Sequence, residues 1–296
     1  MKSFVESNSI IHDQKKLIER ADLDGYLFFR DIVNKDSITN VRSDIANLLW
    51  SNGWLDEGTE PFEAKTTQEA HLNNTEKYLP VYDSIQKIQS FHALAHDAGV
   101  MSLISKILDA TAIPHPCKNA RLMFPSRQEH TTPPHQDFPL IQGTPDVWTV
   151  WIPLGACPAE LGGLVVQSGS HKTGVFPTHK AGPAGISLYD EALKEEKWVT
   201  SPFMKGDALF FHSHTIHKAL PNNSGNLMRL SVDYRYQKST DPFMEDLLMP
   251  HKNRLSWEEV YRDWKSDEYK YYWKDLDLKT VVRKAIAGTG IPKDKY

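Results

Sequence analysis

Cysteine is scarce in this chain of 296 residues, which contains only Cys117 and Cys157. Two cysteines are too few for a disulfide framework, and no apolar run reaches the roughly 18 residues that a transmembrane helix needs. The N-terminal stretch MKSFVESNSIIHDQKK lacks the apolar centre of a secretory signal. A formal net charge of -4 gives no basic footprint for nucleic acid. We therefore expect a cytoplasmic protein that binds neither membranes nor nucleic acid.

Internal repeats, low-complexity segments and a convincing linker are also absent from the sequence. With 40% hydrophobic and 24% charged residues, the composition is that of an ordinary globular protein. The sequence therefore predicts a single domain over residues 1–296. We expect a helical N-terminal layer over about 1–115, a β core over about 116–240 and a helical C-terminal tail over 241–296.

The two ends of the chain show helical patterns of apolar residues. The elements predicted in the N-terminal part are helices over 11–24, 36–52 and 85–108, a strand at 25–30 and a loop at 56–77. Near the other end, Ser256 is followed three residues later by Glu259, which is a capping-box pattern. The tail from Ser256 is therefore predicted to be helical.

The middle of the chain has a different character. From about residue 120 to 236 it consists of short apolar runs separated by glycine, proline, asparagine and serine, among them VWTVWIPL, GGLVVQ, DALFFH and LMRLSVDYRY. Short strands at turn-marked intervals are typical of sandwiches, barrels and jelly rolls. The predicted fold class is mainly β with flanking helices.

A histidine and an aspartate stand two residues apart in the sequence PPHQDFP, after a proline-rich turn and before a predicted apolar strand. Residues at i and i+2 of a strand point to the same face, so His135 and Asp137 are expected to aim at one point. With thirteen histidines in the chain, such a pair alone is a weak signal of a metal site, and its other interpretation is an ordinary histidine–carboxylate pair. A third ligand would complete the two-histidine, one-carboxylate set that suits non-haem Fe(II) and leaves positions open for O2.

Three histidines in GDALFFHSHTIHKAL are candidates for that third ligand. His217 is favoured because twelve residues separate it from Arg229, which allows a hairpin turn that returns the chain beside the metal. His212 and His214 share one strand face, and with His217 they would instead suit a zinc or manganese cupin acting as a hydrolase or isomerase. Spacing alone leaves both arrangements open.

Arg229 and Ser231 share one face of the predicted strand LMRLSVDYRY. An inward arginine is costly unless it meets an anion, and its guanidinium matches a carboxylate in a bidentate fork. The sequence therefore indicates either a dicarboxylate such as 2-oxoglutarate at Arg229 or an ordinary ion pair within the protein.

In these segments the chain resembles the phytanoyl-CoA dioxygenase family of Fe(II)/2-oxoglutarate oxygenases. The resemblance runs from about Leu23 to Tyr236. Its marks are PHQDFP, VWTVWIPLGACPAELGGLVVQSGSH, GDALFFHSHTIH and the Arg229 strand, in that order.

The resemblance implies a double-stranded β-helix core, an Fe(II) cofactor, and 2-oxoglutarate and O2 as co-substrates. The residues that it assigns are His135, Asp137 and His217 as catalytic metal ligands, with Arg229, Trp151, Thr149, Ser231 and Arg121 toward the co-substrate. One departure is Ala219, where a family member has a serine. Because related halogenases replace the metal-binding carboxylate with a small residue, Asp137 favours hydroxylation or another oxidation over halogenation.

The substrate is expected to be a free small organic molecule, because the sequence has no concentrated basic patch for a CoA diphosphate. Candidates for lining its pocket are Gln136, Phe138, Trp148 and Tyr234. The glycine-bearing loop 172–200 and the polar stretch 55–79 are candidate lids. Besides the zinc cupin, a non-catalytic jelly roll used for binding is the other alternative.

Overall fold

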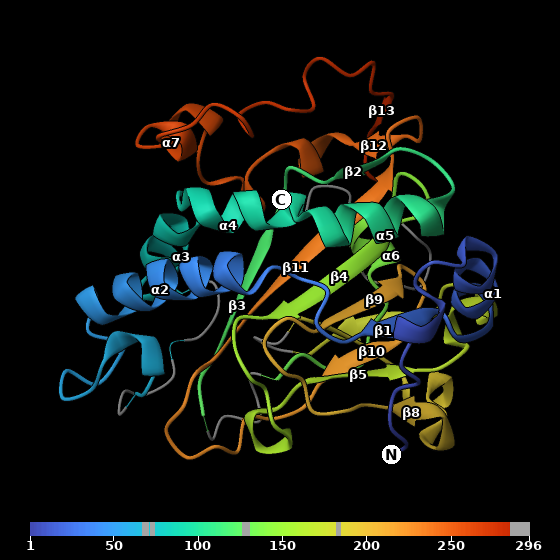
Figure 1. Cartoon of the computed structure of the whole chain (residues 1–296), viewed down its shortest axis with the longest axis horizontal. Helices are drawn as coiled ribbons and strands as arrows, with labels where there is room; N and C mark the ends of the chain where they lie inside the picture. The colour runs from blue at the N-terminus through green and yellow to red at the C-terminus, as the bar shows by residue number, and fades with distance from the viewer. Residues whose placement is uncertain (67–70, 72–74, 126–130, 182–184, 285–296) are drawn as a thin grey trace.

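The computed structural model describes the chain except for residues 67–70, 72–74, 126–130, 182–184 and 285–296. Its centre is a pair of antiparallel β-sheets that share an apolar interior. In Figure 1 the larger sheet, with strands β11, β4 and β9, lies between the helices α4 and α5 and the smaller sheet. No helix in the described part of the chain is long and apolar enough to cross a membrane.

The larger sheet has six strands in the order β1-β9-β4-β11-β2, and β3 pairs with β11 as well. Its strands are β1 (Tyr26–Phe29), β2 (Ala112–Pro114), β3 (Asn119–Met123), β4 (Trp148–Pro153), β9 (Ala208–His212) and β11 (Arg229–Lys238). β11 is the longest strand of this sheet, and it pairs with three other strands, β2, β3 and β4.

The smaller sheet has three strands in the order β10-β5-β8. They are β5 (Leu164–Gln167), β8 (Trp198–Val199) and β10 (His217–Ala219). Two further pairs lie outside these sheets, β6 (Thr178–Lys180) with β7 (Ile186–Leu188) and β12 (Phe243–Met244) with β13 (Thr280–Val281).

Helices cover the outer face of the larger sheet. They are α1 (Gln14–Asp24), α2 (Lys35–Ser51), α3 (Tyr78–Gln86), α4 (Gln89–Ala93) and α5 (Ala98–Leu108). Two further helices, α6 (Phe138–Ile141) and α7 (Trp257–Tyr261), pack in other apolar clusters. The largest apolar cluster joins residues of α2 and α5 to Leu230 and Val232 of β11 and to Val150 of β4. The predicted alternation of β11 is therefore present, with its even-numbered apolar residues facing the helices and its odd-numbered polar residues facing the smaller sheet.

The helix predicted over 85–108 is broken in the structure. Asp97 has an extended backbone (φ -51, ψ 129) and its side chain accepts a hydrogen bond from the amide of Val100, so it starts α5 as an N-cap. The chain before it forms α3, α4 and a short 3-10 turn. Apolar periodicity continued across the break because all three segments pack on the same core.

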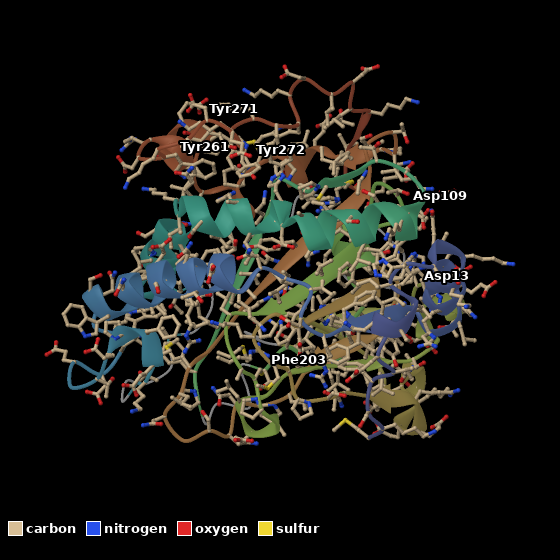
Figure 2. The ribbon with its side chains drawn as sticks, in the orientation of Figure 1. Asp13, Asp109, Phe203, Tyr261, Tyr271 and Tyr272 are labelled. Carbon is tan, nitrogen blue, oxygen red and sulfur yellow. The ribbon has the colours of Figure 1, made fainter. Side chains whose placement is uncertain are left out.

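In the described part of the C-terminal tail, α7 is the only α-helix, and the rest forms short 3-10 helices, turns and two short strands, which contradicts the predicted helical tail. Ser256 and Glu259 form the predicted capping box. After α7 the described residues form turns and the short β13, because aromatic side chains pack with Trp257 and Trp273 into a separate cluster. Figure 2 shows Tyr261, Tyr271 and Tyr272 gathered in this segment.

The hairpin predicted between His217 and Arg229 is also wrong. β10 pairs with β5 in the smaller sheet, whereas β11 pairs with β4 in the larger one. The turn after Ala219 therefore crosses from one sheet to the other. It places His217 and Arg229 on opposite walls of the space between the sheets.

Candidate metal centre

Three side chains converge between the two sheets. Nε2 of His135 lies 3.7 Å from Oδ1 of Asp137, and Nε2 of His217 lies 3.9 Å from the same oxygen. One ligand atom from each residue falls within 4.8 Å of the others, and all three residues are buried. Within the described residues, this is the group of histidines, cysteines and carboxylates that can hold a metal ion.

The sequence predicts that His135 and Asp137 lie on one regular strand. In the structure they do not. His135 forms an isolated antiparallel bridge with His217, and the two residues exchange backbone hydrogen bonds of 3.0 Å. Asp137 has already turned into a helical conformation (φ -73, ψ -33) as the residue that precedes α6. The strand bridge aligns the two histidines, and the turn swings the carboxylate across to meet them.

Both histidines are fixed by the ring nitrogen that faces away from the site. Nδ1 of His135 lies 2.9 Å from the carbonyl oxygen of Pro133, and Nδ1 of His217 lies 3.0 Å from that of Thr215. Because a carbonyl only accepts hydrogen bonds, each Nδ1 carries the proton, and a neutral ring then has a free lone pair on Nε2. The donor set of two imidazole nitrogens and one carboxylate oxygen fits a ferrous ion.

Electrostatics keep Asp137 and His217 in their metal-binding protonation states. Burial by itself raises the pKa of the Asp137 carboxyl, but Arg235, His135 and His217 together hold that pKa well below its usual range. Burial, with the neighbouring His135, lowers the pKa of His217 to about 3. Asp137 is therefore ionised and His217 neutral at physiological pH.

Two residues of the larger sheet hold Oδ2 of Asp137, the second oxygen of this carboxylate. The hydroxyl of Thr149 donates a 2.6 Å hydrogen bond to Oδ2, and Nε and Nη2 of Arg235 each lie 3.3 Å from the same atom. Thr149, predicted to contact the co-substrate, lines the pocket and also bonds the carboxylate ligand. Arg235 was not singled out from the sequence.

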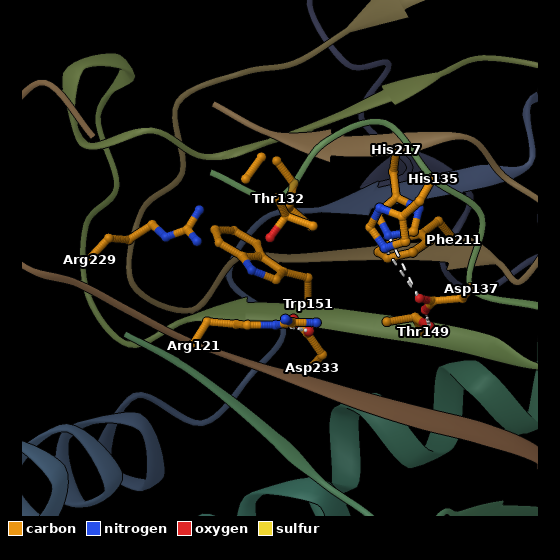
Figure 3. A pocket seen from close by; sticks show the side chains of 12 residues that line it. Arg121, Thr132, His135, Asp137, Thr149, Trp151, Phe211, His217, Arg229 and Asp233 are labelled. Atoms are coloured by element: carbon orange, nitrogen blue, oxygen red, sulfur yellow. Dashed lines mark hydrogen bonds and ion pairs between the residues drawn. The ribbon is translucent and has the colours of Figure 1, made fainter. Parts of the chain in front are cut away.

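A second group of residues lies toward the other end of the same pocket. Figure 3 shows the ring of Trp151 between the histidine pair and the side chain of Arg229. Arg229 is 2% exposed, and its Nη1 donates a 2.5 Å hydrogen bond to the carbonyl oxygen of Gly162. Its Nε is buried without a hydrogen-bond partner among the described residues. Burial lowers the pKa of the Arg229 guanidinium, which means that burial disfavours its charged form. An anion bound at this end of the pocket would stabilise the charge.

The remaining residues predicted for the co-substrate are already paired. Nε1 of Trp151 donates to the hydroxyl of Ser231 at 3.1 Å, which fixes the indole ring. Nε of Arg121 donates to Oδ2 of Asp233 at 2.6 Å. Arg121, Trp151 and Asp233 line the pocket, and Ser231 supports its wall from behind.

His212 and His214 lie outside the metal group. Nδ1 of His212 accepts a hydrogen bond from the amide of His214, and its Nε2 faces Asp146 at 3.9 Å. The ring of His214 packs against Phe138. Of the three downstream histidines, the structure brings only His217 to the cluster with His135 and Asp137.

The four residues suggested for the substrate do not line the pocket. The side-chain amide of Gln136 hydrogen-bonds the carbonyl oxygens of Gly174 and His214 and the amide of Phe176. Tyr234 faces the helices and donates to the carbonyl oxygen of Phe91. Trp148 belongs to the same helix-side core, and Phe138 begins α6.

The pocket is lined by residues of both sheets and of the segment before His135. The lining residues are Arg121, Thr132, His135, Asp137, Thr149, Trp151, Leu164, Phe211, His217, Ala219, Arg229 and Asp233. None of the described residues in the two candidate lids, 172–200 and 55–79, is among them. Gly182, one of the glycines that suggested a lid, lies outside the described residues.

Comparison with known proteins identifies the family of the chain. The sequence profile described as "Phytanoyl-CoA dioxygenase (PhyH)" matches residues 21–231, which is more than half of the chain. The chain belongs to the phytanoyl-CoA dioxygenase family. It is an enzyme of the iron- and 2-oxoglutarate-dependent oxygenase class, and the interpretation as a non-catalytic jelly roll is set aside.

Two curated relatives share about a quarter of their residues with the chain. Both are named 1-deoxypentalenic acid 11-beta-hydroxylase. The protein from Streptomyces exfoliatus is 25% identical over 258 residues, covering 81% of this chain and 87% of the relative. The protein from Streptomyces arenae is 24% identical over 255 residues, covering 80% and 86%.

Solved structures confirm the predicted double-stranded β-helix fold. The epimerase SnoN, in complex with Fe3+, alpha ketoglutarate and nogalamycin RO, has a TM-score of 0.57 at 18% identity and covers 78% of this chain and 86% of its own. EvdO2 from Micromonospora carbonacea var. aurantiaca, complexed with 2-oxoglutarate, has a TM-score of 0.53 at 20% identity and covers 80% and 93%. At these identities the likeness concerns the fold.

One signal in the sequence would have found the missed residues. β11 alternates strictly, with Arg229, Ser231, Asp233 and Arg235 on one face and apolar or tyrosine side chains on the other. Four buried polar residues on one strand face indicate a polar cavity rather than a core. Asp233 and Arg235 share the strand face of Arg229, so the same cost of burying a charge applies to them.

Proposed function

We propose that His135, Asp137 and His217 bind Fe(II), that Arg229 binds the distal carboxylate of 2-oxoglutarate, and that the enzyme hydroxylates a small organic acid. Turnover would convert 2-oxoglutarate, O2 and the substrate to succinate, CO2 and the hydroxylated product, with one oxygen atom of O2 in succinate and the other in the product. The observation that carries this proposal is a metal-ligand triad and a buried, uncompensated arginine at two ends of one pocket. We also propose that residues 1–296 act as a single domain around this pocket.

Each group has a distinct task in this scheme. Bound iron, together with 2-oxoglutarate, supplies the O2 chemistry that breaks a substrate C–H bond. The histidines and Asp137 bind the metal. Trp151 lines the side of the pocket along the stretch from the metal to Arg229. The ring of Phe211 packs on His217 and excludes water from the metal end of the pocket, and Leu164 adds further apolar lining.

The charges of the pocket support an acidic substrate. Arg121 and Arg229 line the pocket together with Asp137 and Asp233, and Arg235 adds one further positive charge from behind Asp137. Because the charges of a ferrous ion and of the 2-oxoglutarate dianion cancel, the loaded pocket keeps one positive charge. A small carboxylate would neutralise it, and the substrate named for both curated relatives is also an acid.

The first test measures succinate formed from 2-oxoglutarate in the presence of Fe(II) and O2. We expect slow succinate formation without substrate, and faster formation with members of a library of carboxylic acids. Each acid is paired with its methyl ester, which should be a poorer substrate. Equal acceleration by acid and ester would refute the acidic substrate class, and no succinate from folded, iron-loaded enzyme would refute the proposed reaction.

Alanine at any of the three proposed ligands removes a donor that no neighbouring residue replaces. His135→Ala, Asp137→Ala and His217→Ala are therefore each expected to abolish iron-dependent succinate formation. His212→Ala is the matched control, since His212 lies outside the triad, and it should retain turnover. Full activity in any triad variant would disprove that ligand assignment.

A further inference from the structure

The two oxygens of Asp137 have different surroundings. Oδ2 accepts the Thr149 hydroxyl at 2.6 Å and is approached by Nε and Nη2 of Arg235. Oδ1 faces Nε2 of both histidines and receives one Arg235 contact, at 3.2 Å. Oδ1 is therefore the oxygen that lies near Nε2 of both histidines, and Oδ2 is the oxygen that Thr149 holds.

The two residues that hold Oδ2 lie on adjacent strands in the interior of the larger sheet. Thr149 on β4 and Arg235 on β11 are directly opposite each other in the central strand pair of the larger sheet. Thr149 is 1% exposed and Arg235 is 7% exposed, so no solvent competes for these contacts. A cross-strand pair in a sheet interior fixes its side chains more tightly than a loop does. Arg235 also lies beyond residue 231, where the family match ends.

We propose that Thr149 and Arg235 are positioning residues that present a single oxygen of Asp137, Oδ1, to the metal. This inference rests on the proposed function. If both carboxylate oxygens reached the ion, one of them would occupy a position that 2-oxoglutarate or O2 needs. The pair therefore keeps part of the coordination sphere open for the co-substrates.

The proposal predicts a separation between metal binding and co-substrate binding. In Thr149→Val, Arg235→Met and the double variant, metal affinity is expected to be retained, because removing a cation next to Asp137 does not weaken its attraction for another. The released Oδ2 then competes for the open position. We expect the affinity of the metal-loaded enzyme for 2-oxoglutarate to fall about tenfold in the double variant and less in each single variant.

Co(II) is a suitable probe, because its visible absorption reports the ligands around it. Apo enzyme is titrated with Co(II), and the Co(II) enzyme is then titrated with 2-oxoglutarate. Urea unfolding of each apo variant measures its stability. Arg235→Lys, which keeps the charge but loses the fork, should bind 2-oxoglutarate more tightly than Arg235→Met does.

A control variant separates this role from general stabilisation. Arg30 pairs with the buried Asp207 at 2.6 Å, so Arg30→Met also removes an arginine from a buried carboxylate. It should leave both titrations unchanged. Thr149→Val preserves side-chain shape and tests the inference even if the arginine variants do not fold.

Two results would overturn the inference. One is a double variant whose titrations match the wild type. The other is a fall in Co(II) and 2-oxoglutarate affinity by the same factor together with lower stability, which is the signature of a purely structural pair. If the wild type itself bound no Co(II), or if 2-oxoglutarate left its spectrum unchanged, the proposed function would fail instead.

Discussion

At the scale of single residues, Arg229 shows how a charge without a protein partner marks a ligand. Its guanidinium is buried, and the described residues offer it the carbonyl of Gly162 but no carboxylate. A charge-assisted contact is typically worth about 1.5–3 kcal/mol, or about 10- to 100-fold in affinity. Arg229→Gln should therefore raise the KM for 2-oxoglutarate at least about tenfold and lower kcat less.

That prediction is checked by succinate kinetics with 2-oxoglutarate varied at saturating iron. Arg254→Gln is the control, because Arg254 forms an exposed ion pair with Asp83 away from the pocket. An unchanged KM in Arg229→Gln would remove Arg229 from the co-substrate site.

The sequence was sufficient to predict that His135, Asp137 and His217 converge, but not the contacts that hold them. The His135 and Asp137 pair was found through strand periodicity, although the structure uses a bridge followed by a helical turn. Thr149 was placed on the face that lines the pocket, but its hydrogen bond to Asp137 was not predicted. A strand pattern gives the face of a side chain, whereas its partner depends on the register between strands, here Thr149 opposite Arg235.

At the scale of elements, the C-terminal segment is tied to the helix that follows Asp137. Arg283 donates to the carbonyl oxygen of Leu140 at 2.7 Å and forms an ion pair of the same length with Asp246. The side chain of Gln142 pairs with the backbone of Lys284 through hydrogen bonds of 2.8 and 2.9 Å. The end of the described chain thus supports α6 from outside the residues that match the family.

Removing Arg283 leaves the Leu140 carbonyl and the Asp246 carboxylate without this donor. The side chain of Arg283 is 3% exposed, so solvent replaces these contacts poorly. Arg283→Ala should lower the free energy of unfolding by about 3 kcal/mol, measured by urea denaturation. Arg262→Ala, at an exposed position, should change it by less than about 0.5 kcal/mol. Equal effects of the two substitutions would contradict a supporting role for the segment.

The elements were predictable to different degrees for physical reasons. The helices α1 and α2 have regular amphipathic patterns and side-chain caps at Asp13 and Asn34, and they fall close to their predicted bounds. The C-terminal tail was not predictable, because its conformation depends on packing of its aromatic side chains with one another and against Ile113, which is distant in sequence. Local patterns specify a helix with its own caps, but not a segment that is shaped by tertiary contacts.

At the scale of the whole molecule, burial of histidines links stability to pH. Burial lowers the pKa of His96, His115 and His212 from 6.5 to about 3 each. Above pH 6.5 these rings are neutral in both the folded and the unfolded chain. Below it, the unfolded chain takes up protons that the folded chain does not, so stability falls as the pH falls. Between pH 6.5 and about 5, one such histidine costs about 2 kcal/mol.

His96 allows this prediction to be tested at one position. Its ring stacks on Tyr269 at 4.3 Å and meets the edge of Tyr272 at 4.5 Å. Phenylalanine keeps this aromatic packing but cannot take up a proton in the unfolded chain. In His96→Phe apo enzyme, the free energy of unfolding should therefore fall less between about pH 6.5 and 5 than in the wild type, by up to about 2 kcal/mol. Urea denaturation across this range measures the difference, with His12→Phe at an exposed position as the control. If both variants kept the wild-type pH dependence, the acid sensitivity would not arise from a buried neutral His96.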